Sequence, residues 1–144
     1  MSDADSARSL ERAIADYNEA WNAHDLDAIV SMHAPDMVFE NHTAGESAQG
    51  EAVRDHIAAI FATWPDIGFA TRRLYVRDGL AVQEWTATAT HANRMTRGDL
   101  IAEPTGKTIT WDGLDVIPFA EGLVKRKDVY SDSVSILRQL ELGP

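Results

Sequence analysis

The hydrophobic pattern of this chain changes period once, near residue 67, and that change restricts its fold more than any other feature. Before it, apolar residues recur at three- and four-residue spacing, as on one face of a helix. After it, apolar and polar residues alternate, as on a half-buried strand. Helices followed by strands, with no linker or repeat, predict an α+β domain. We therefore expect one domain over residues 1–144.

Three helices are predicted before the change of period. The first spans about residues 5–23 and carries a continuous apolar stripe. The second begins after Asp25, a good N-cap residue, and ends near Pro35, ahead of a short strand at 37–39. The third ends at Pro65, because proline cannot continue a helix.

The second part of the chain predicts an antiparallel meander that ends in a short helix, Ser133 to Leu140. The strands are expected at about 67–77, 80–92, 107–119 and 123–132. Asp78-Gly79 and Ala120-Glu121-Gly122 predict tight turns between them. Helices laid against a curved antiparallel sheet would form a cone around a pocket, with the loop 93–105 as a lid over its mouth.

Composition excludes several classes of protein. A net charge of −10 over 144 residues argues against nucleic-acid binding, which depends on Lys and Arg. The absence of cysteine excludes disulfide scaffolds and thiolate metal sites, and the histidines lack metal-ligand spacing, so we expect no metal. We find neither an apolar run long enough for a membrane span nor a secretory signal, and we expect a cytoplasmic protein.

Polar residues in apolar phases are the candidates for chemistry. Asp115 falls on the apolar face of the strand 107–119, and His91 ends the face of 80–92 that carries Trp85. Tyr130 and Asp132 share one phase of the last strand. A carboxyl group in an apolar pocket has its charged form disfavoured, which suits it to act as a base or a hydrogen-bond donor near neutral pH.

Each candidate also has a structural interpretation. Asp132 directly precedes the last helix and can serve as its N-cap. Asp115 would face solvent if a bulge reversed the phase of its strand. Tyr17, on the first helix, can be a core residue with a satisfied hydroxyl, and His91 can sit on an exposed strand end.

Several segments, in this order and spacing, resemble the NTF2-like superfamily, especially the SnoaL-like polyketide cyclases and the ketosteroid isomerases. The resemblance runs from about Leu10 to Leu142. It is carried by Tyr17-Asn18-Glu19-Ala20-Trp21-Asn22-Ala23-His24-Asp25, Asp36-Met37-Val38-Phe39-Glu40, Gly50-Glu51-Ala52-Val53-Arg54, Glu84-Trp85, Gly106-Lys107, Asp115-Val116-Ile117-Pro118-Phe119, Tyr130-Ser131-Asp132 and Leu137-Arg138-Gln139-Leu140.

The resemblance implies roles for particular residues. Tyr17 and Asp115 match the oxyanion-binding tyrosine and the protonated aspartic acid of ketosteroid isomerases. Asp132 matches the acid/base aspartate of the SnoaL-like cyclases. His91 is a second acid or a substrate contact. The pocket wall is expected to consist of Asn41, Trp85, Trp111, Phe119, Asp128 and Tyr130.

The implied function is a cofactor-independent acid/base enzyme acting through an enolate on a small hydrophobic carbonyl compound, as an isomerase, aldol-type cyclase or lyase. One alternative is a noncatalytic NTF2-like module that binds a small molecule or dimerises. A weaker alternative is an epoxide hydrolase of the limonene-epoxide-hydrolase type. The resemblance also implies a homodimer formed through the outer sheet face, near Glu84, Thr86, Thr88 and Thr90.

Overall fold

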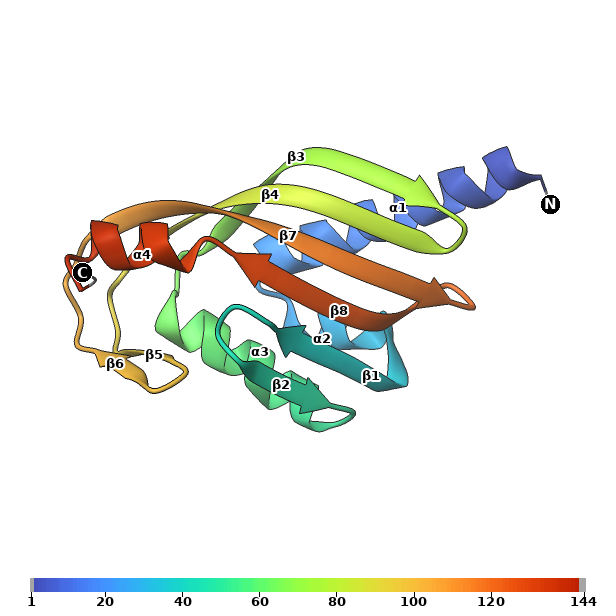
Figure 1. Cartoon of the computed structure of the whole chain (residues 1–144). Helices are drawn as coiled ribbons and strands as arrows, with labels where there is room; N and C mark the ends of the chain where they lie inside the picture. Colours follow the sequence, from blue (N-terminus) through green and yellow to red (C-terminus); the bar gives the residue numbers. More distant parts are fainter. Residues whose placement is uncertain (1, 143–144) are drawn as a thin grey trace.

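A strongly bent sheet wraps around two helices in this protein (Figure 1). The structure is a computed structural model and describes residues 2–142. The helices are α1 (Asp3–Asn22), α2 (Leu26–Ser31), α3 (Ala52–Thr63) and α4 (Ser133–Gln139). The strands are β1 (His33–Asn41), β2 (Glu46–Gln49), β3 (Gly68–Arg77), β4 (Leu80–Thr90), β5 (Met95–Arg97), β6 (Leu100–Ala102), β7 (Thr108–Ala120) and β8 (Leu123–Ser131). Within these residues no helix is both long and apolar enough to cross a bilayer.

The main sheet has the strand order β2-β1-β8-β7-β4-β3. Its β3-β4-β7-β8 portion is the antiparallel meander that the alternating pattern predicts, and the α+β class is confirmed. β1 pairs in parallel with β8, so β8 lies between β7 of the meander and the N-terminal strand β1. This placement brings residues from both halves of the chain onto one concave face.

The N-terminal strands are longer than the sequence predicts. β1 already begins at His33, so α2 ends at Ser31 and the predicted helix end near Pro35 is wrong. Long-range pairing with β8 causes the difference, because it holds this segment extended. β2 was not predicted, and the predicted loop over 93–105 contains the β5–β6 hairpin.

Glycine at position 113 allows one wall of the interior to form. Gly113 of β7 pairs with Trp85 of β4, and a Cβ atom at 113 would lie 2.2 Å from the Trp85 ring. No side chain tolerates such an approach, so only glycine lets the indole lie across its neighbouring strand. The flat ring can then face the space between the sheet and the helices.

An extra residue in β8 reverses its alternation partway along. Val116 pairs with Asp128 and Phe119 with Val124, so β8 has one more residue than β7 in this interval. This is a β-bulge. Val124 points inward, but beyond the bulge it is Lys127 that is buried, while Asp128 is only partly buried. The predicted phase of the last strand is therefore wrong from this point onward.

Candidate functional site

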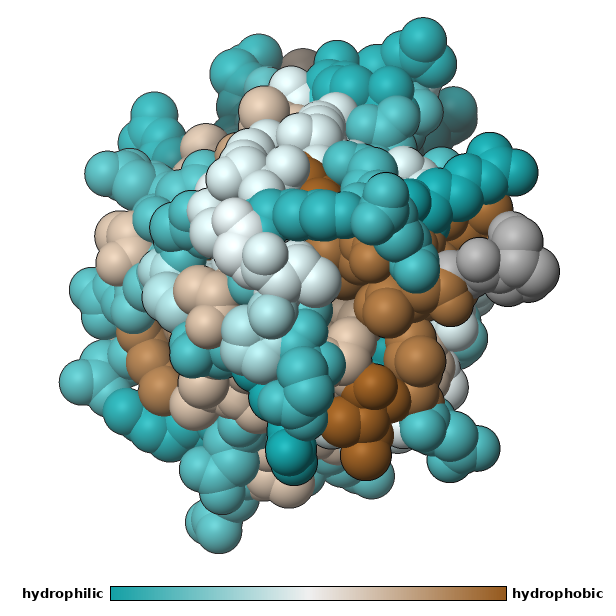
Figure 2. All heavy atoms as spheres, turned by 90° about the vertical axis from the view of Figure 1, so that its left-hand side faces the viewer, coloured by the Kyte–Doolittle hydropathy of each residue, from teal (hydrophilic) through white to brown (hydrophobic). Residues whose placement is uncertain are grey.

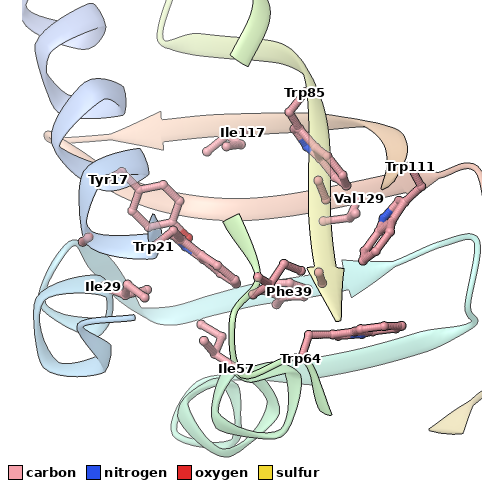
Figure 3. Close-up of a cluster of buried hydrophobic side chains, with 14 of the residues drawn as sticks. Tyr17, Trp21, Ile29, Phe39, Ile57, Trp64, Trp85, Trp111, Ile117 and Val129 are labelled. Atoms are coloured by element: carbon pink, nitrogen blue, oxygen red, sulfur yellow. The ribbon is translucent and has the colours of Figure 1, made fainter. Parts of the chain in front are cut away.

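A cavity of about 160 Å³ lies between the concave face of the sheet and the helices α1 and α3, and it is partly open to solvent. Its wall combines polar side chains with six aromatic ones: Trp21, Phe39, Trp64, Trp85 and Trp111, which Figure 3 shows, and Phe69. A dry cavity of roughly 150 Å³ holds a benzene-sized molecule. The size and lining therefore suit a small ring compound.

A chain of side-chain amides holds one carboxyl group in this wall. Gln83 Nε2 donates to Asp115 Oδ2 (3.1 Å) and to Asn18 Oδ1 (3.0 Å), and Asn18 Nδ2 donates back to Gln83 Oε1 (2.8 Å). Asp115 is only 3% exposed. Its second oxygen, Oδ1, is buried and has no hydrogen-bond partner among residues 2–142. One oxygen is thus held by a hydrogen bond, and the other is unpaired in the protein interior.

A buried lysine stands beside this carboxyl group. Lys127 Nζ lies 3.8 Å from Asp115 Oδ2 and 3.7 Å from the centroid of the Trp21 ring. Its side chain is 8% exposed and lines the cavity. Burial lowers the pKa of Lys127, and the nearby Asp115 carboxylate partly offsets this. The cavity therefore holds an acid and a base of opposite charge within an aromatic enclosure.

Two indole N–H groups of the wall are also unpaired. Trp21 Nε1 and Trp85 Nε1 are buried and lack a hydrogen-bond partner within the described part of the chain. Nearly all buried donors in proteins find an acceptor, so such groups call for an explanation. Both residues line the cavity, but their nitrogen atoms are buried and not exposed to it.

Tyr17 does not belong to the cavity wall. It is fully buried, and its hydroxyl is hydrogen bonded to His33 Nε2 at 2.8 Å. Burial raises the pKa of Tyr17 well above its usual value, so the phenol stays neutral. Burial and the charge of Lys127 lower the pKa of His33 to about 4. The structure supports the core interpretation of Tyr17, and this placement gives no geometric support for its predicted role as an oxyanion donor.

His91 is likewise buried behind the cavity wall. Its exposed fraction is 0%, so the interpretation as an exposed strand end is wrong. Thr105 N–H donates to His91 Nδ1 (3.3 Å), and Thr105 Oγ1 lies 3.0 Å from the same nitrogen. The ring also packs against Trp64. These contacts tie the loop that follows β6 to the end of β4.

Asp132 lies outside the cavity and is exposed. It is the N-cap of α4, and its Oδ1 accepts from Ser135 N–H at 3.0 Å. The bulge explains the misplacement, because it turns the other phase of β8 inward. Asp132 and Asp115 are therefore not brought together, and this placement gives no geometric support for a base at Asp132 in this cavity.

Asp128 belongs to a charged cluster on the opposite face of β8. Arg126 donates to Asp128 Oδ1 (2.8 Å) and to Glu40 Oε1 (3.2 Å), and His42 Nε2 lies 2.8 Å from Asp128 Oδ1. Hydrogen bonds from Arg126 lower the pKa of Asp128. Tyr130, 46% exposed, stacks on His42. Neither Asp128 nor Tyr130 reaches the cavity, and the bulge again is the cause.

The remaining wall predictions have mixed outcomes. Asn41, Trp85 and Trp111 line the cavity, as does Asp115, whose outward alternative is thereby wrong. Phe119 does not, since it lies at the far end of β7 beside Val124.

The cavity mouth carries an arginine from the β5–β6 hairpin. Arg97 donates from Nε to Ser133 Oγ (2.8 Å) and from Nη2 to Ser131 Oγ (2.6 Å). Burial lowers the pKa of Arg97, and Glu46 acts in the opposite direction. Burial likewise lowers the pKa of His56. Figure 2 views the molecule from the side where β5, β6 and α4 lie, and apolar atoms gather there within a mostly hydrophilic surface.

Sequence reasoning missed several residues of the wall. Asn18 and Lys127 both line the cavity. Lys127 carried no signal, because its strand phase depends on the bulge. Gln83 is a polar residue on the same strand face as Trp85. A buried amide beside a buried carboxyl group is the signal that could have identified it as part of the site.

Comparison with known proteins identifies the family. Residues 14–127 match the model of the SnoaL-like domain. AclR from Streptomyces galilaeus, a candidate hydroxylase, aligns at 20% identity with a TM-score of 0.81, covering 96% of this chain and 88% of AclR. A candidate SnoaL-like polyketide cyclase from Jannaschia sp. CCS1 aligns at 16% identity with a TM-score of 0.80, covering 94% and 93%.

A third solved structure extends the likeness. IdmH from Streptomyces antibioticus, a candidate polyketide cyclase, aligns at 24% identity with a TM-score of 0.76, covering 91% of this chain and 97% of IdmH. At such identities these structures establish the fold alone. No curated protein matches the sequence significantly. The family match covers most of the chain, and it agrees with the helices and the curved sheet, so this protein belongs to the SnoaL-like family of the NTF2-like superfamily.

Proposed function

We propose that this protein is a cofactor-independent acid/base enzyme that removes a proton next to the carbonyl group of a small, apolar ring compound. Asp115 is the base. The observation that carries this assignment is its Oδ1 atom, which is buried in the wall of an aromatic cavity and unpaired among the described residues. A buried, unsatisfied carboxyl oxygen costs free energy, and a substrate C–H group placed against it would use that reactivity.

The neighbouring groups suit the charge that develops in this reaction. Proton removal leaves negative charge on the carbonyl oxygen as an enolate forms. Lys127 supplies a positive charge beside Asp115 in the wall of the cavity. Fixed donors and charges in a site poor in water stabilise such an oxyanion by a few kcal/mol.

The positioning of Asp115 also supports the proposal. Gln83 holds Oδ2, and Asn18 in turn holds Gln83, so the carboxyl plane is fixed by residues of α1 and β4. A general base contributes on the order of 10²–10⁴-fold when it is held within reach of the proton. The SnoaL-like family membership and the candidate cyclases among similar folds favour an enolate that adds to a second carbonyl, an aldol-type cyclisation.

Deuterium exchange tests the assignment without knowledge of the natural substrate. The probe is 2-tetralone, a small ring ketone with acidic α-protons, incubated in D2O with catalytic amounts of protein. We expect exchange well above the buffer rate, and a loss on the order of 100-fold or more in Asp115→Asn. Mass spectrometry of the ketone measures the exchange.

Asp132→Asn is the matched control, since that carboxyl group caps α4 outside the cavity. It should retain the full exchange rate. If Asp132→Asn lost exchange and Asp115→Asn kept it, the base would be misassigned. If the ketone bound, as shown by quenching of tryptophan fluorescence, and no variant affected exchange, the protein would be a binding module.

A further inference from the structure

Lys127 differs from the other lysines of this protein in its surroundings. The sequence has three lysines, at 107, 125 and 127. Lys125 is exposed, and Lys107 pairs with Glu141 at 3.0 Å. Lys127 lines the cavity, and within residues 2–142 its Nζ atom has no hydrogen bond and only Asp115 as a charged neighbour, at 3.8 Å. Its amine is therefore held against the ligand space with little to restrain it.

We propose that Lys127 forms a covalent imine with the carbonyl group of the ligand, with Asp115 transferring the protons. This inference rests on the proposed function, because it concerns the same carbonyl compound in the same cavity. It goes further because it names the group that accepts the electrons of the broken C–H bond. That group is the C=N bond of a protonated imine, in place of the enolate oxygen. Lys127 is then a nucleophile and not only a positive charge.

Burial of Lys127 favours the neutral amine that such a step needs. Burial lowers the pKa of Lys127, so a larger fraction is unprotonated near neutral pH than for a solvated lysine. The Trp21 ring at 3.7 Å and the Asp115 carboxylate oppose this by favouring the ammonium. These two neighbours also suit the product, because a protonated imine keeps the positive charge at the same nitrogen.

The chemistry balances with the groups present. The nitrogen lone pair of Lys127 attacks the carbonyl carbon, a C–N bond forms, and the carbonyl π pair moves to oxygen. Asp115 relays a proton from nitrogen to that oxygen, giving a carbinolamine. Asp115 takes up a proton from solvent and gives it to the hydroxyl, which leaves as water while the nitrogen lone pair forms the C=N bond, so Asp115 is again a carboxylate. Asp115 can next take the α-proton, and the C–H electrons move into the iminium to give an enamine.

The aromatic wall assists dehydration of the carbinolamine. Trp21 and Phe39 lie under the amine, with ring centroids 3.7 and 5.6 Å from Nζ. The released water can leave on the side where the cavity is open to solvent. A flat, conjugated imine would gain contact with the same rings.

Reductive trapping tests the inference directly. The full-length protein is incubated near neutral pH with 2-tetralone or benzaldehyde and sodium cyanoborohydride, which reduces an imine to a stable amine. One adduct is expected, with a mass increase equal to the probe less one oxygen atom. Peptide mapping should place it mainly on Lys127 and not on Lys125, because Lys127 lines the cavity that binds the probe and burial lowers its pKa.

Two variants provide the controls. Lys127→Met should abolish the rapid adduct, and Lys125→Met should leave it unchanged, because that side chain is exposed two residues away. If Lys127→Met fails to fold, competition in the wild-type protein gives the same information. Tetralin, which has the ring shape without the carbonyl, should then protect Lys127 and not Lys125.

The outcomes separate this inference from the function on which it rests. Equal labelling of Lys125 and Lys127 would overturn the imine. Quenching of tryptophan fluorescence and Asp115-dependent exchange without any Lys127 adduct would also overturn it, while leaving the acid/base function intact. Absence of both binding and exchange would overturn the proposed function itself.

Discussion

Both faces of β8 carry charged side chains, but the two faces differ in how completely these charges are paired. On the outer face, Arg126 bonds to Asp128 and Glu40, and His42 lies against Asp128, so the charges satisfy one another. On the inner face, Lys127 has only Asp115 at 3.8 Å, and one Asp115 oxygen is unpaired among the described residues. The outer charged groups are paired with one another, whereas the inner pair leaves one carboxylate oxygen without a hydrogen-bond partner among the described residues.

This difference indicates where to look for chemistry in a charged molecule. The Glu40, His42 and Asp128 ligand atoms lie within 4.8 Å of one another, which on distance alone resembles a metal site. The Arg126 guanidinium already supplies the positive charge there. Burial and incomplete pairing, and not proximity of acidic groups, make the inner pair the candidate site.

Removing the inner carboxylate should produce the largest effect. In Asp115→Leu, Lys127 is left as a buried charge without its partner. Breaking a buried ion pair in this way costs about 3–5 kcal/mol, so the free energy of unfolding in urea should fall by that order. The outer variant Asp128→Asn should lose about 1 kcal/mol or less, because that site is partly solvated.

The double variant Asp115→Leu/Lys127→Met sharpens the interpretation. It removes both charges and should recover most of the lost stability, since an apolar pair can replace a buried ion pair at little cost. A double variant no more stable than Asp115→Leu would show that cavity packing, not the uncompensated charge, dominates.

Acid should weaken the inner region through His33. The pKa of His33 is about 4 in the folded protein, against 6.5 for a free side chain, so the unfolded chain takes up a proton that the folded one refuses. The contribution of His33 is full above pH 6.5 and is lost as the pH falls toward 4. The free energy of unfolding should drop by up to about 3 kcal/mol over this window.

The variants that test this pH effect lie in the same region. His33→Gln should flatten the pH dependence measured by urea unfolding, with the lowered pKa of His56 leaving a smaller slope of the same sign. Lys127→Met should flatten it partly, because the charge of Lys127 is the second cause after burial. An unchanged slope in His33→Gln would exclude His33 as the source.

Closing the space beside Trp85 should affect the cavity itself. Gly113→Ala places a methyl group 2.2 Å from a Trp85 ring atom, so the indole must move. Overpacking of this kind costs about 1–3 kcal/mol. Quenching of tryptophan fluorescence by 2-tetralone should be lost, whereas the outward Thr88→Ala should keep it. Retained binding in Gly113→Ala would show that Trp85 does not shape the ligand space.

The smallest change is expected at the outer cluster. Arg126→Gln frees Glu40 and Asp128 on a hydrated surface, so the free energy of unfolding should change by about 1 kcal/mol or less. Deuterium exchange of 2-tetralone should not change, because none of these residues lines the cavity. A large loss of exchange in this variant would mean that the two faces of β8 are coupled.

Local patterns were enough to predict most of the fold. The four long strands and the helices follow from apolar spacing, and Asp78-Gly79 has positive φ at both residues, as a tight hairpin turn requires. The parallel pairing of β1 with β8 could not be predicted this way, since it joins segments far apart in sequence. β2 and the β5–β6 hairpin are too short to show a period.

The site was only partly predictable for a related reason. Asp115 interrupts the apolar face of a regular strand, and it lies in the cavity as that pattern indicates. Lys127 is buried and Asp132 is exposed, the reverse of what simple alternation along β8 predicts. The side that each residue faces depends on the pairing of β8 with β7, not on the residues of β8 alone. Asn18 and Gln83 reveal their role only when α1 packs on β4.

The additional residue in β8 also has a consequence for protein engineering and for divergence within the family. Deleting one amino acid between Val124 and Asp128 would restore simple alternation and rotate the following stretch by half a turn. Basic and acidic side chains would then trade sides without any of them being mutated. A one-residue change in length at this point can therefore change which charged side chains face the interior, while the fold of the domain is retained.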